Sequence, residues 1–517
     1  MRVDLPGGLR LHGWQLAVVP ALAIVTVLAM GLGLFGLLPG QGETSAAVVT
    51  SRPAITSSSP TASPNETAPT PAPAPVLAPV GASAPLPTSA GLDAALSWLL
   101  ARPDLGRHVG GAVVDVATGR LLYGSAAGNA FAPASTTKLL TATAALAVLG
   151  PNFRIQTKVV AGSTPGQVVL VGGGDPTLST AAPAGFVPAP ASLADLAGET
   201  AAALHAAGIT TVTLGYDTTL FAGPRVAQTW PPTDITTGVV SPVTALSLDE
   251  GRVGEMVEGP AARVVDPPLS AAKAFERRLV ALGIKVSGQP APARAPRAPA
   301  ASASPTSASS ADSPASAAPS ANPPTAGTTL AVVQSPALSD LVAWMLSTSD
   351  NDLAEAVAHL TALHAGQPPT FAGGVAAVTK SLQALGLGLA QVRLYDGSGL
   401  TGSTQASPAL LGSVLSLAAS PDHPTLRPLL TGLAVAGFSG SMTTRFSDAA
   451  TRAAAGLVRV KSGTLSVVSA LAGTVLDADG RELAFVFLAD QVPIGGTPAA
   501  REALDRLATA VAGCGCR

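Results

Sequence analysis

The chain has 517 residues, a formal net charge of −2 and only 12% charged residues. Nucleic-acid binding depends on a positive field that neutralises phosphates, so this balance argues against nucleic acid as a partner. The length allows two or three domains with buried cores, but 54 glycines and 46 prolines indicate that linkers separate them.

An apolar segment without any charge occupies residues 15–38, after a short N-terminus at 1–14. As a helix it is long enough to cross a hydrocarbon core of about 30 Å, and Arg2 and Arg10 before it predict a cytoplasmic N-terminus. We therefore expect a single-pass anchor in the cell membrane, with the rest of the chain outside the cytoplasm. The alternative is a cleaved signal peptide and a secreted protein, since residues 45–47 are small enough for cleavage.

Small residues and proline dominate two stretches, residues 39–90 and residues 287–328. Such sequence cannot bury enough apolar surface to offset the entropy lost on ordering. We expect the first stretch to be a disordered tether, extended by its prolines, that carries the folded part away from the membrane. The second is expected to be a disordered low-complexity insertion in mid-chain.

Folded sequence begins with a helical pattern from Leu92. Between residues 110 and 124, two apolar runs flank a short turn with glycine, which is the pattern of a β-hairpin. The helix that starts near residue 133 is apolar nearly all round and is therefore predicted to be buried. Residues 156–286 alternate short strands with helices, and we expect them to form an inserted α+β domain.

After the second linker, apolar residues at helical spacing predict a helix from Leu338 that ends at 347–351. Strands are expected to follow near the C-terminus and to pair with the N-terminal hairpin in one antiparallel sheet flanked by helices. We therefore expect a fold of the α/β class, α+β type, with one domain formed by residues 91–155 and 329–513. The other predicted elements are a helix from 352, strands at 456–461, 467–476 and 482–488, and a helix at 498–511.

Ser135 and Lys138 form an S-x-x-K sequence at the start of the buried helix. A serine is a poor nucleophile until a base removes its proton, and a lysine three residues later lies on the same helical face. The lysine acts as a base only if its pKa falls well below about 10.4. Burial in the apolar helix and a second cation, Lys461, are the two expected causes.

Two further polar sequences supply the other groups of a candidate site. Ser349 is a hydroxyl able to pass a proton to a leaving nitrogen, and Asn351 offers an amide to a peptide-like substrate. Lys461, Ser462 and Thr464 lie on a predicted strand and suit a carboxylate. Gly463, on the same strand, lets a substrate backbone approach closely.

Competing sequences exist and are weaker. A second S-x-x-K begins at Ser270 and ends at Lys273, but its helix carries Glu276, Arg277 and Arg278, so it cannot be a buried central helix, and no hairpin leads into it. A second S-x-N at 320–322 lies within low-complexity sequence.

Metal and cofactor chemistry has no sequence support. Six histidines show no zinc spacing, and His359 and His364 lie five residues apart, so we read them as surface residues and expect no metal and no cofactor. Cys514 and Cys516 are the only cysteines. They could pair or remain free, and we expect them to lie in a disordered tail without a catalytic role.

The order S-x-x-K, S-D-N, K-S-G resembles that of penicillin-binding proteins and serine β-lactamases. Over about 95–513 the chain is similar to the class C low-molecular-mass penicillin-binding proteins, the D-alanyl-D-alanine carboxypeptidase/endopeptidases. Ser462 stands where that family usually has threonine. Further matches, which we credit to architecture more than to catalysis, lie at 172–178, 241–247, 396–400 and 436–445.

This resemblance implies a hydrolase without cofactor that cleaves peptidoglycan stem peptides and is inhibited covalently by β-lactams. Ser135 would attack the penultimate D-alanine, Lys138 would be the base and Ser349 the proton shuttle. The backbone N–H groups of Ser135 and Thr464 would form the oxyanion hole, and Lys461 with the hydroxyls beside it would receive the terminal carboxylate. The alternatives are a β-lactamase-like hydrolase and a non-enzymatic, tethered wall-binding protein.

Overall fold

The computed structural model describes residues 84–180, 187–254, 259–297 and 323–517, all within one structural unit, Pro75–Arg517. The predicted membrane segment at 15–38, nearly all of the predicted tether and the S-x-N sequence at 320–322 lie outside the described residues. None of the helices in the described ranges is long and apolar enough to cross a membrane.

The first sheet joins the two ends of the described chain. Its six strands follow the order β2-β1-β12-β11-β10-β9, and β1 runs antiparallel to β12 with Val109 opposite Ala489. The predicted pairing of the N-terminal hairpin with the C-terminal strands is therefore confirmed. The strands are β1 Val109–Asp115, β2 Leu121–Ser125, β9 Ala434–Val435, β10 Arg459–Leu465, β11 Val468–Leu476 and β12 Glu482–Ala489.

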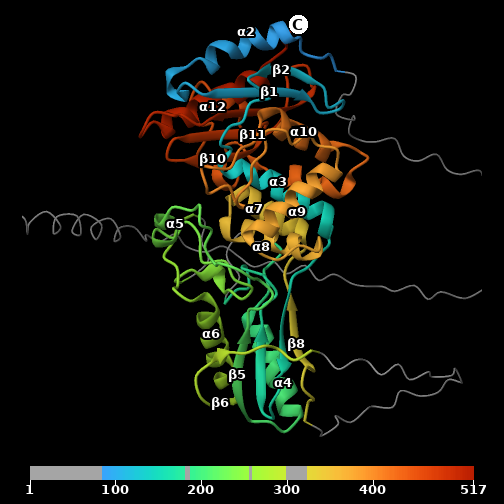
Figure 1. Ribbon diagram of the computed structural model, residues 1–517. Coiled ribbons are helices and arrows are strands. Elements are labelled where there is room, and N and C mark those ends of the chain that lie inside the picture. Colours follow the sequence, from blue (N-terminus) through green and yellow to red (C-terminus); the bar gives the residue numbers. More distant parts are fainter. Residues whose placement is uncertain (1–83, 181–186, 255–258, 298–322) are drawn as a thin grey trace, which may run out of the picture. The chain divides into compact units, whose positions relative to one another are not determined.

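Helices cover both faces of this sheet, because its strand β12 is apolar on both sides (Figure 1). Val486 and Leu488 belong to one core, whereas Phe485 and Phe487 belong to the other, as alternation along a strand requires. The helices on the face of Phe485 are α2 Ser89–Leu100 and α12 Thr497–Ala512. Those on the other face are α3 Thr137–Leu149, α7 Leu338–Thr348, α8 Asn351–His364, α9 Phe371–Ala384, α10 Pro408–Ala419 and α11 Pro428–Thr431.

Two helix predictions can be compared directly with the structure. Every residue of α3 from Thr137 to Leu146 is buried, as its apolar pattern predicts. α2 begins at Ser89 rather than Leu92, because the side chain of Thr88 accepts a hydrogen bond from the amide of Gly91 and caps the helix.

The inserted region has its own mixed sheet, in the order β6-β5-β4-β3-β8 with β7 beside β5. β3 and β4 are antiparallel, whereas β4 and β5 are parallel. The predicted α+β character of this region is confirmed. Its strands are β3 Gln156–Ala161, β4 Gln167–Val171, β5 Thr211–Asp217, β6 Lys285–Val286, β7 Ala291–Pro292 and β8 Thr329–Gln334, and its helices are α4 Leu193–Ala206, α5 Pro232–Thr236 and α6 Pro267–Ala281.

Two predicted boundaries are wrong. β8, expected in the catalytic domain, pairs with β3 of the inserted sheet, with Gln156 opposite Gln334. β7 lies in the stretch expected to be disordered at 287–328, and the amide of Ala293 after it donates to the carbonyl of Tyr216 at 2.9 Å. Backbone pairing needs no apolar side chains, so composition did not indicate it; residues 298–322 of that stretch lie outside the described part.

The expectation of a disordered tail around the cysteines and the surface assignment of one histidine are also wrong, whereas pairing of the cysteines was one of the alternatives left open. Cys514 and Cys516 are joined by a disulfide, and the Cys516 carbonyl accepts a hydrogen bond from the amide of Thr88, so the tail packs beside the start of α2. Cys514 is part of the core on that face. His359 is buried between the rings of Phe221 and Phe371, and burial lowers its pKa to about 4. α8 is buried over most of its circumference, which the spacing of two histidines does not reveal.

Candidate active site

Ser135 lies in a short 3₁₀ turn, Ala134–Thr136, that leads directly into α3. Lys138 follows in the first turn of α3, and its Nζ lies 3.1 Å from Oγ of Ser135. The spacing of three residues therefore brings these groups together, as the sequence predicts. Ser135 is half-buried, whereas Lys138 is fully buried.

The amine of Lys138 has three polar partners. Besides contacting Ser135, it donates to Oδ1 of Asn351 at 2.7 Å and to the carbonyl oxygen of Ser398 at 2.8 Å. A neutral amine has two N–H bonds and one lone pair, so these acceptors can take both hydrogens and leave the lone pair for the Ser135 hydroxyl. Such an arrangement suits a general base beside its nucleophile.

Burial lowers the pKa of Lys138 from an ordinary 10.5 to about 8. The negative charges of Glu355, Asp396, Asp350 and Asp352 oppose this shift without cancelling it. The fraction of unprotonated amine grows as the pH rises towards 8, so any reaction that uses this amine as a base should accelerate over the same interval.

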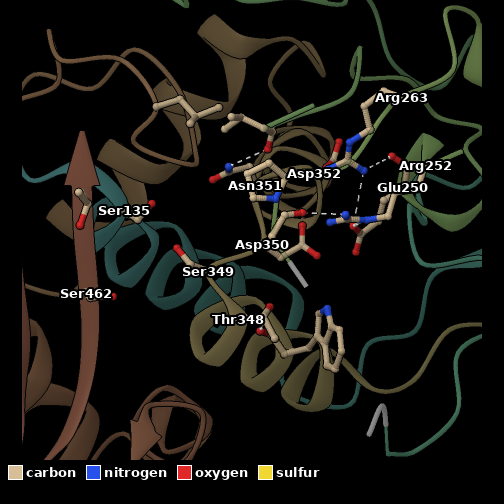
Figure 2. A pocket seen from close by; sticks show the side chains of 16 residues that line it. Ser135, Glu250, Arg252, Arg263, Thr348, Ser349, Asp350, Asn351, Asp352 and Ser462 are labelled. Carbon is tan, nitrogen blue, oxygen red and sulfur yellow. Dashed lines mark hydrogen bonds and ion pairs between the residues drawn. The ribbon is translucent and has the colours of Figure 1, made fainter. Parts of the chain in front are cut away.

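Ser349 and Asn351 lie at the junction of α7 and α8. Ser349 ends α7 with a left-handed backbone, φ 65°, and the side chain of Asp350 caps α8 by accepting from the amide of Leu353. This turn places Asn351 against Lys138. Ser349 and Ser135 line one pocket of about 280 Å³, shown in Figure 2.

The third predicted motif lies on β10. Ser462 and Thr464 line the pocket, and the Ser462 hydroxyl lies 3.4 Å from that of Ser441. Lys461 is fully buried outside the pocket lining, and its Nζ donates to the Ser462 carbonyl at 2.7 Å. Burial, together with the charge of Lys138, holds the pKa of Lys461 well below its ordinary value. The charge of Lys138 therefore disfavours a proton on Lys461, whereas burial, and not Lys461, is the cause that lowers the pKa of Lys138.

The missing side chain of Gly463 allows close packing between β10 and the turn at Ser135. A Cβ atom at Gly463 would lie 2.7 Å from the carbonyl oxygen of Pro133 and 3.0 Å from the amide nitrogen of Ser135. The residue does not line the pocket. Its missing side chain thus lets β10 approach the turn that carries Ser135.

The inserted region contacts the S-D-N sequence directly. Asn351 donates from Nδ2 to the carbonyl of Val239 at 3.0 Å. Asp352 accepts from the amide of Ser241 at 2.7 Å and forms an ion pair with Arg263 at 2.9 Å. Sequence analysis did not identify the Val239 carbonyl or the Ser241 amide as partners, because backbone groups leave no mark in the sequence, and it gave no reason to pair Arg263 with Asp352.

A group of charged side chains continues this contact along the pocket (Figure 2). Oxygens of Glu250, Asp350 and Asp352 lie within 4.8 Å of one another, and Arg252 donates to Glu250 at 2.9 Å. Burial and the neighbouring carboxylates raise the pKa of Glu250 well above its ordinary value. With the guanidinium of Arg263 also present, the group is best described as a buried ion-pair network that joins the inserted region to α8.

The competing S-x-x-K sequence lies elsewhere. Ser270 and Lys273 are on α6 of the inserted region, and the side chain of Lys273 is exposed. Neither residue lines the pocket around Ser135. Lys273 is therefore not a buried amine beside Ser270.

Sequence analysis gave too little weight to residues 396–400. The carbonyl of Ser398 in this loop accepts from Lys138, and two buried carboxylates hold the loop in place. Glu355 accepts from the amides of Gly397 and Ser398, and Asp396 accepts from Trp230 at 2.8 Å. The D-G-S-G-L sequence, noted as a match, was the available signal.

The D-Ala-D-Ala carboxypeptidase 3 (S13) family matches residues 92–262 and 316–511 of the chain. A carboxypeptidase of Mycobacterium tuberculosis is 35% identical over 431 residues, which cover 82% of this chain and 84% of that protein. Carboxypeptidase DacB of Mycolicibacterium smegmatis is 36% identical over 431 residues, which cover 82% of this chain and 85% of that protein.

A solved structure supports the fold. Penicillin binding protein 4 of Haemophilus influenzae superimposes with a TM-score of 0.61 at 22% identity, over 80% of this chain and 97% of that one. That protein has also been solved in complex with a β-lactam. The matches span most of the chain and include all three sequence motifs, and the chain accordingly belongs to the D-Ala-D-Ala carboxypeptidase 3 (S13) family.

Proposed function

We propose that the chain is a serine-type D-Ala-D-Ala carboxypeptidase/endopeptidase that acts on peptidoglycan stem peptides through an acyl-enzyme on Ser135, and that β-lactams inhibit it by acylating the same serine. The observation that carries this proposal is the triple contact of Lys138 with Ser135, Asn351 and the Ser398 carbonyl. This contact leaves a lone pair of the amine facing the nucleophile.

The reaction then follows from these groups. Lys138 takes the hydroxyl proton as Oγ of Ser135 attacks the carbonyl carbon of the penultimate D-alanine. The peptide C–N bond breaks, Ser349 relays a proton to the leaving amine, and an ester remains on Ser135. Water, activated by the same amine, hydrolyses the ester and restores the serine.

One edge of β10 is suited to an extended peptide. On that edge β9 pairs only with Arg459 and Val460, so among the described strands none pairs with β10 there from Lys461 onward. A substrate strand can add to such an edge through backbone hydrogen bonds. The amides of Ser135 and Thr464 are the proposed oxyanion donors, a contribution typically worth about 3 kcal/mol per donor.

The Lys461→Gln variant tests how the terminal carboxylate is recognised. The substitution replaces a buried amine that lies behind the hydroxyls of Ser462 and Thr464, and that can carry a positive charge once a carboxylate binds beside it. We expect kcat/KM for a D-Ala-D-Ala peptide to fall about tenfold or more, and to fall less for a neutral ester, since charge attraction to the carboxylate is lost.

The pH profile of the same variant separates a second role of Lys461. If its charge also lowers the pKa of Lys138, the acidic limb of kcat/KM should move to higher pH in Lys461→Gln. We expect carboxylate recognition to dominate. Equal losses for peptide and ester, with a limb displaced by about one unit or more, would contradict this expectation.

We also propose that residues 15–38 anchor the protein in the cell membrane, with the catalytic part outside the cytoplasm. Support comes from the uncharged apolar length of this segment and from Arg2 and Arg10 before it. Fractionation of cells that express the full chain should recover it with membranes. Recovery from the medium, without residues 1–47, would favour the signal peptide.

Release of D-alanine tests the proposed function. The purified full chain should liberate the terminal D-alanine from a peptide ending in D-Ala-D-Ala but not from the same peptide ending in L-Ala-L-Ala. A penicillin should abolish this release in a time-dependent manner. A tethered wall-binding protein predicts binding without any release, and a β-lactamase predicts rapid penicillin turnover with little peptide cleavage.

A further inference from the structure

Glu355 is a fully buried carboxylate that no step of the proposed reaction uses. It lies on α8 four residues after Asn351, so both side chains face the same side of the helix. That side is the one that contacts Lys138. An acidic group at this position, without solvent, calls for a structural or electrostatic explanation.

The carboxylate of Glu355 holds the loop that contacts Lys138. Its oxygens accept from the amide of Gly397 at 3.1 and 3.0 Å and from the amide of Ser398 at 2.8 Å. The carbonyl of the same Ser398 accepts from Nζ of Lys138. A single residue, Ser398, therefore links the carboxylate of Glu355 to the hydrogen bond that orients Lys138.

The loop is fixed on its other sides as well. Oγ1 of Thr141 in α3 donates to the Gly397 carbonyl at 2.7 Å. A Cβ atom at Gly397 would lie 2.7 Å from that of Ala358, so the loop packs closely on α8. Asp396 is a second buried acid and accepts from the amide of Gly399 at 2.9 Å.

Glu355 also faces Lys138 as a charge. Burial, followed by the charge of Asp396, raises the pKa of Glu355 to about 8, the range in which Lys138 titrates. The other groups that face this pair are Asp350 and Asp352 at the start of α8 and Lys461 on β10. Two neighbouring groups in one range titrate together, so ionised Glu355 favours the protonated form of Lys138.

We propose that Glu355 is a positioning residue of the acylation reaction: it fixes the Ser398 carbonyl that orients Lys138, and it serves as the buried counter-charge of that lysine. The inference rests on the proposed function, in which Lys138 is the base for Ser135. It adds a group that touches neither the substrate nor the reacting atoms.

The Glu355→Gln variant tests the proposal through the pH dependence of penicillin acylation. The amide removes the negative charge and places an NH₂ group opposite a backbone N–H. We expect the acidic limb of the pH profile of the acylation rate to move to lower pH by about one unit, because Lys138 then loses its proton more easily. The rate on the plateau should fall about tenfold, because the loop is held less well.

Two further variants separate charge from packing. Glu355→Asp keeps the charge on a shorter side chain, so the plateau should fall while the limb stays in place. Glu502→Gln alters an exposed glutamate on α12 and is the matched control. It should neither lower the plateau rate nor move the acidic limb. The proposal would be overturned if the acidic limb of the acylation rate in Glu355→Gln stayed in place or moved to higher pH.

If Glu355→Gln does not fold, Thr141→Val still tests the loop. Loss of the hydroxyl that holds Gly397 should lower the plateau several-fold without moving the limb, and an unchanged rate would refute positioning by the loop. Failure of the unaltered protein to react with penicillin would instead remove the proposed function, so the two failures are distinguishable.

Discussion

Replacement of Ser135 by alanine should abolish covalent labelling by a fluorescent penicillin and lower D-alanine release by about 10⁴-fold or more. No other hydroxyl in the described part of the chain has a fully buried lysine amine within 3.1 Å. The loss should occur without a change in unfolding temperature, since Ser135 is half-buried and alanine is accommodated in the same turn.

Ser270→Ala is the matched control for this variant. It alters the serine of the other S-x-x-K sequence, whose lysine is exposed on α6. Labelling and peptide cleavage should remain at the level of the unaltered protein. Label retained in Ser135→Ala and lost in Ser270→Ala would show that the site has been assigned to the wrong serine.

Replacement of Lys138 by methionine should slow penicillin acylation by about 10²- to 10⁴-fold, the range typical of a general base. Methionine fills much of the same buried volume but offers no lone pair of comparable basicity to the Ser135 hydroxyl. The residual reaction should also lose the acidic limb near pH 8, because the group that titrates there is gone.

Labelling time courses from pH 6 to pH 10 measure both effects, with Lys273→Met as the matched control. That lysine occupies the same position in the other S-x-x-K sequence and is exposed, so its loss should change neither rate nor profile. A Lys138→Met protein that reacts within a factor of a few of the unaltered one would mean that another group is the base.

The parts of the fold that follow from local pattern could be predicted. The apolar circumference of α3 indicated a buried helix, and the hairpin at 110–124 indicated the strands β1 and β2. The contact of Ser135 with Lys138 needs only three residues of helical geometry. Local periodicity was therefore enough to predict that Ser135 and Lys138 lie side by side.

Contacts through the backbone could not be predicted. The Ser398 carbonyl lies 260 residues after Lys138, and any residue type could supply that oxygen. The same holds for the Val239 carbonyl that accepts from Asn351, and for β7 within low-complexity sequence. Predicting such contacts requires the path of the whole chain, which periodicity and motif spacing do not give.

Long-range burial explains the remaining differences. Glu355 and Lys461 are charged residues in a sequence where charge usually marks the surface, yet both are fully buried beside the site. Asp352 and Arg263 form an ion pair between two regions that the sequence predicts as separate domains. Such groups become recognisable as functional only when the structure shows what surrounds them.

The most direct test of the account is to identify the acylated residue in the unaltered protein. After reaction with a penicillin and proteolysis, mass spectrometry should find the added mass on the peptide that contains Ser135, and fragmentation should place it on that serine. An adduct on Ser349, on Ser270 or on any other residue would contradict the assignment of Ser135 as nucleophile and of Lys138 as its base.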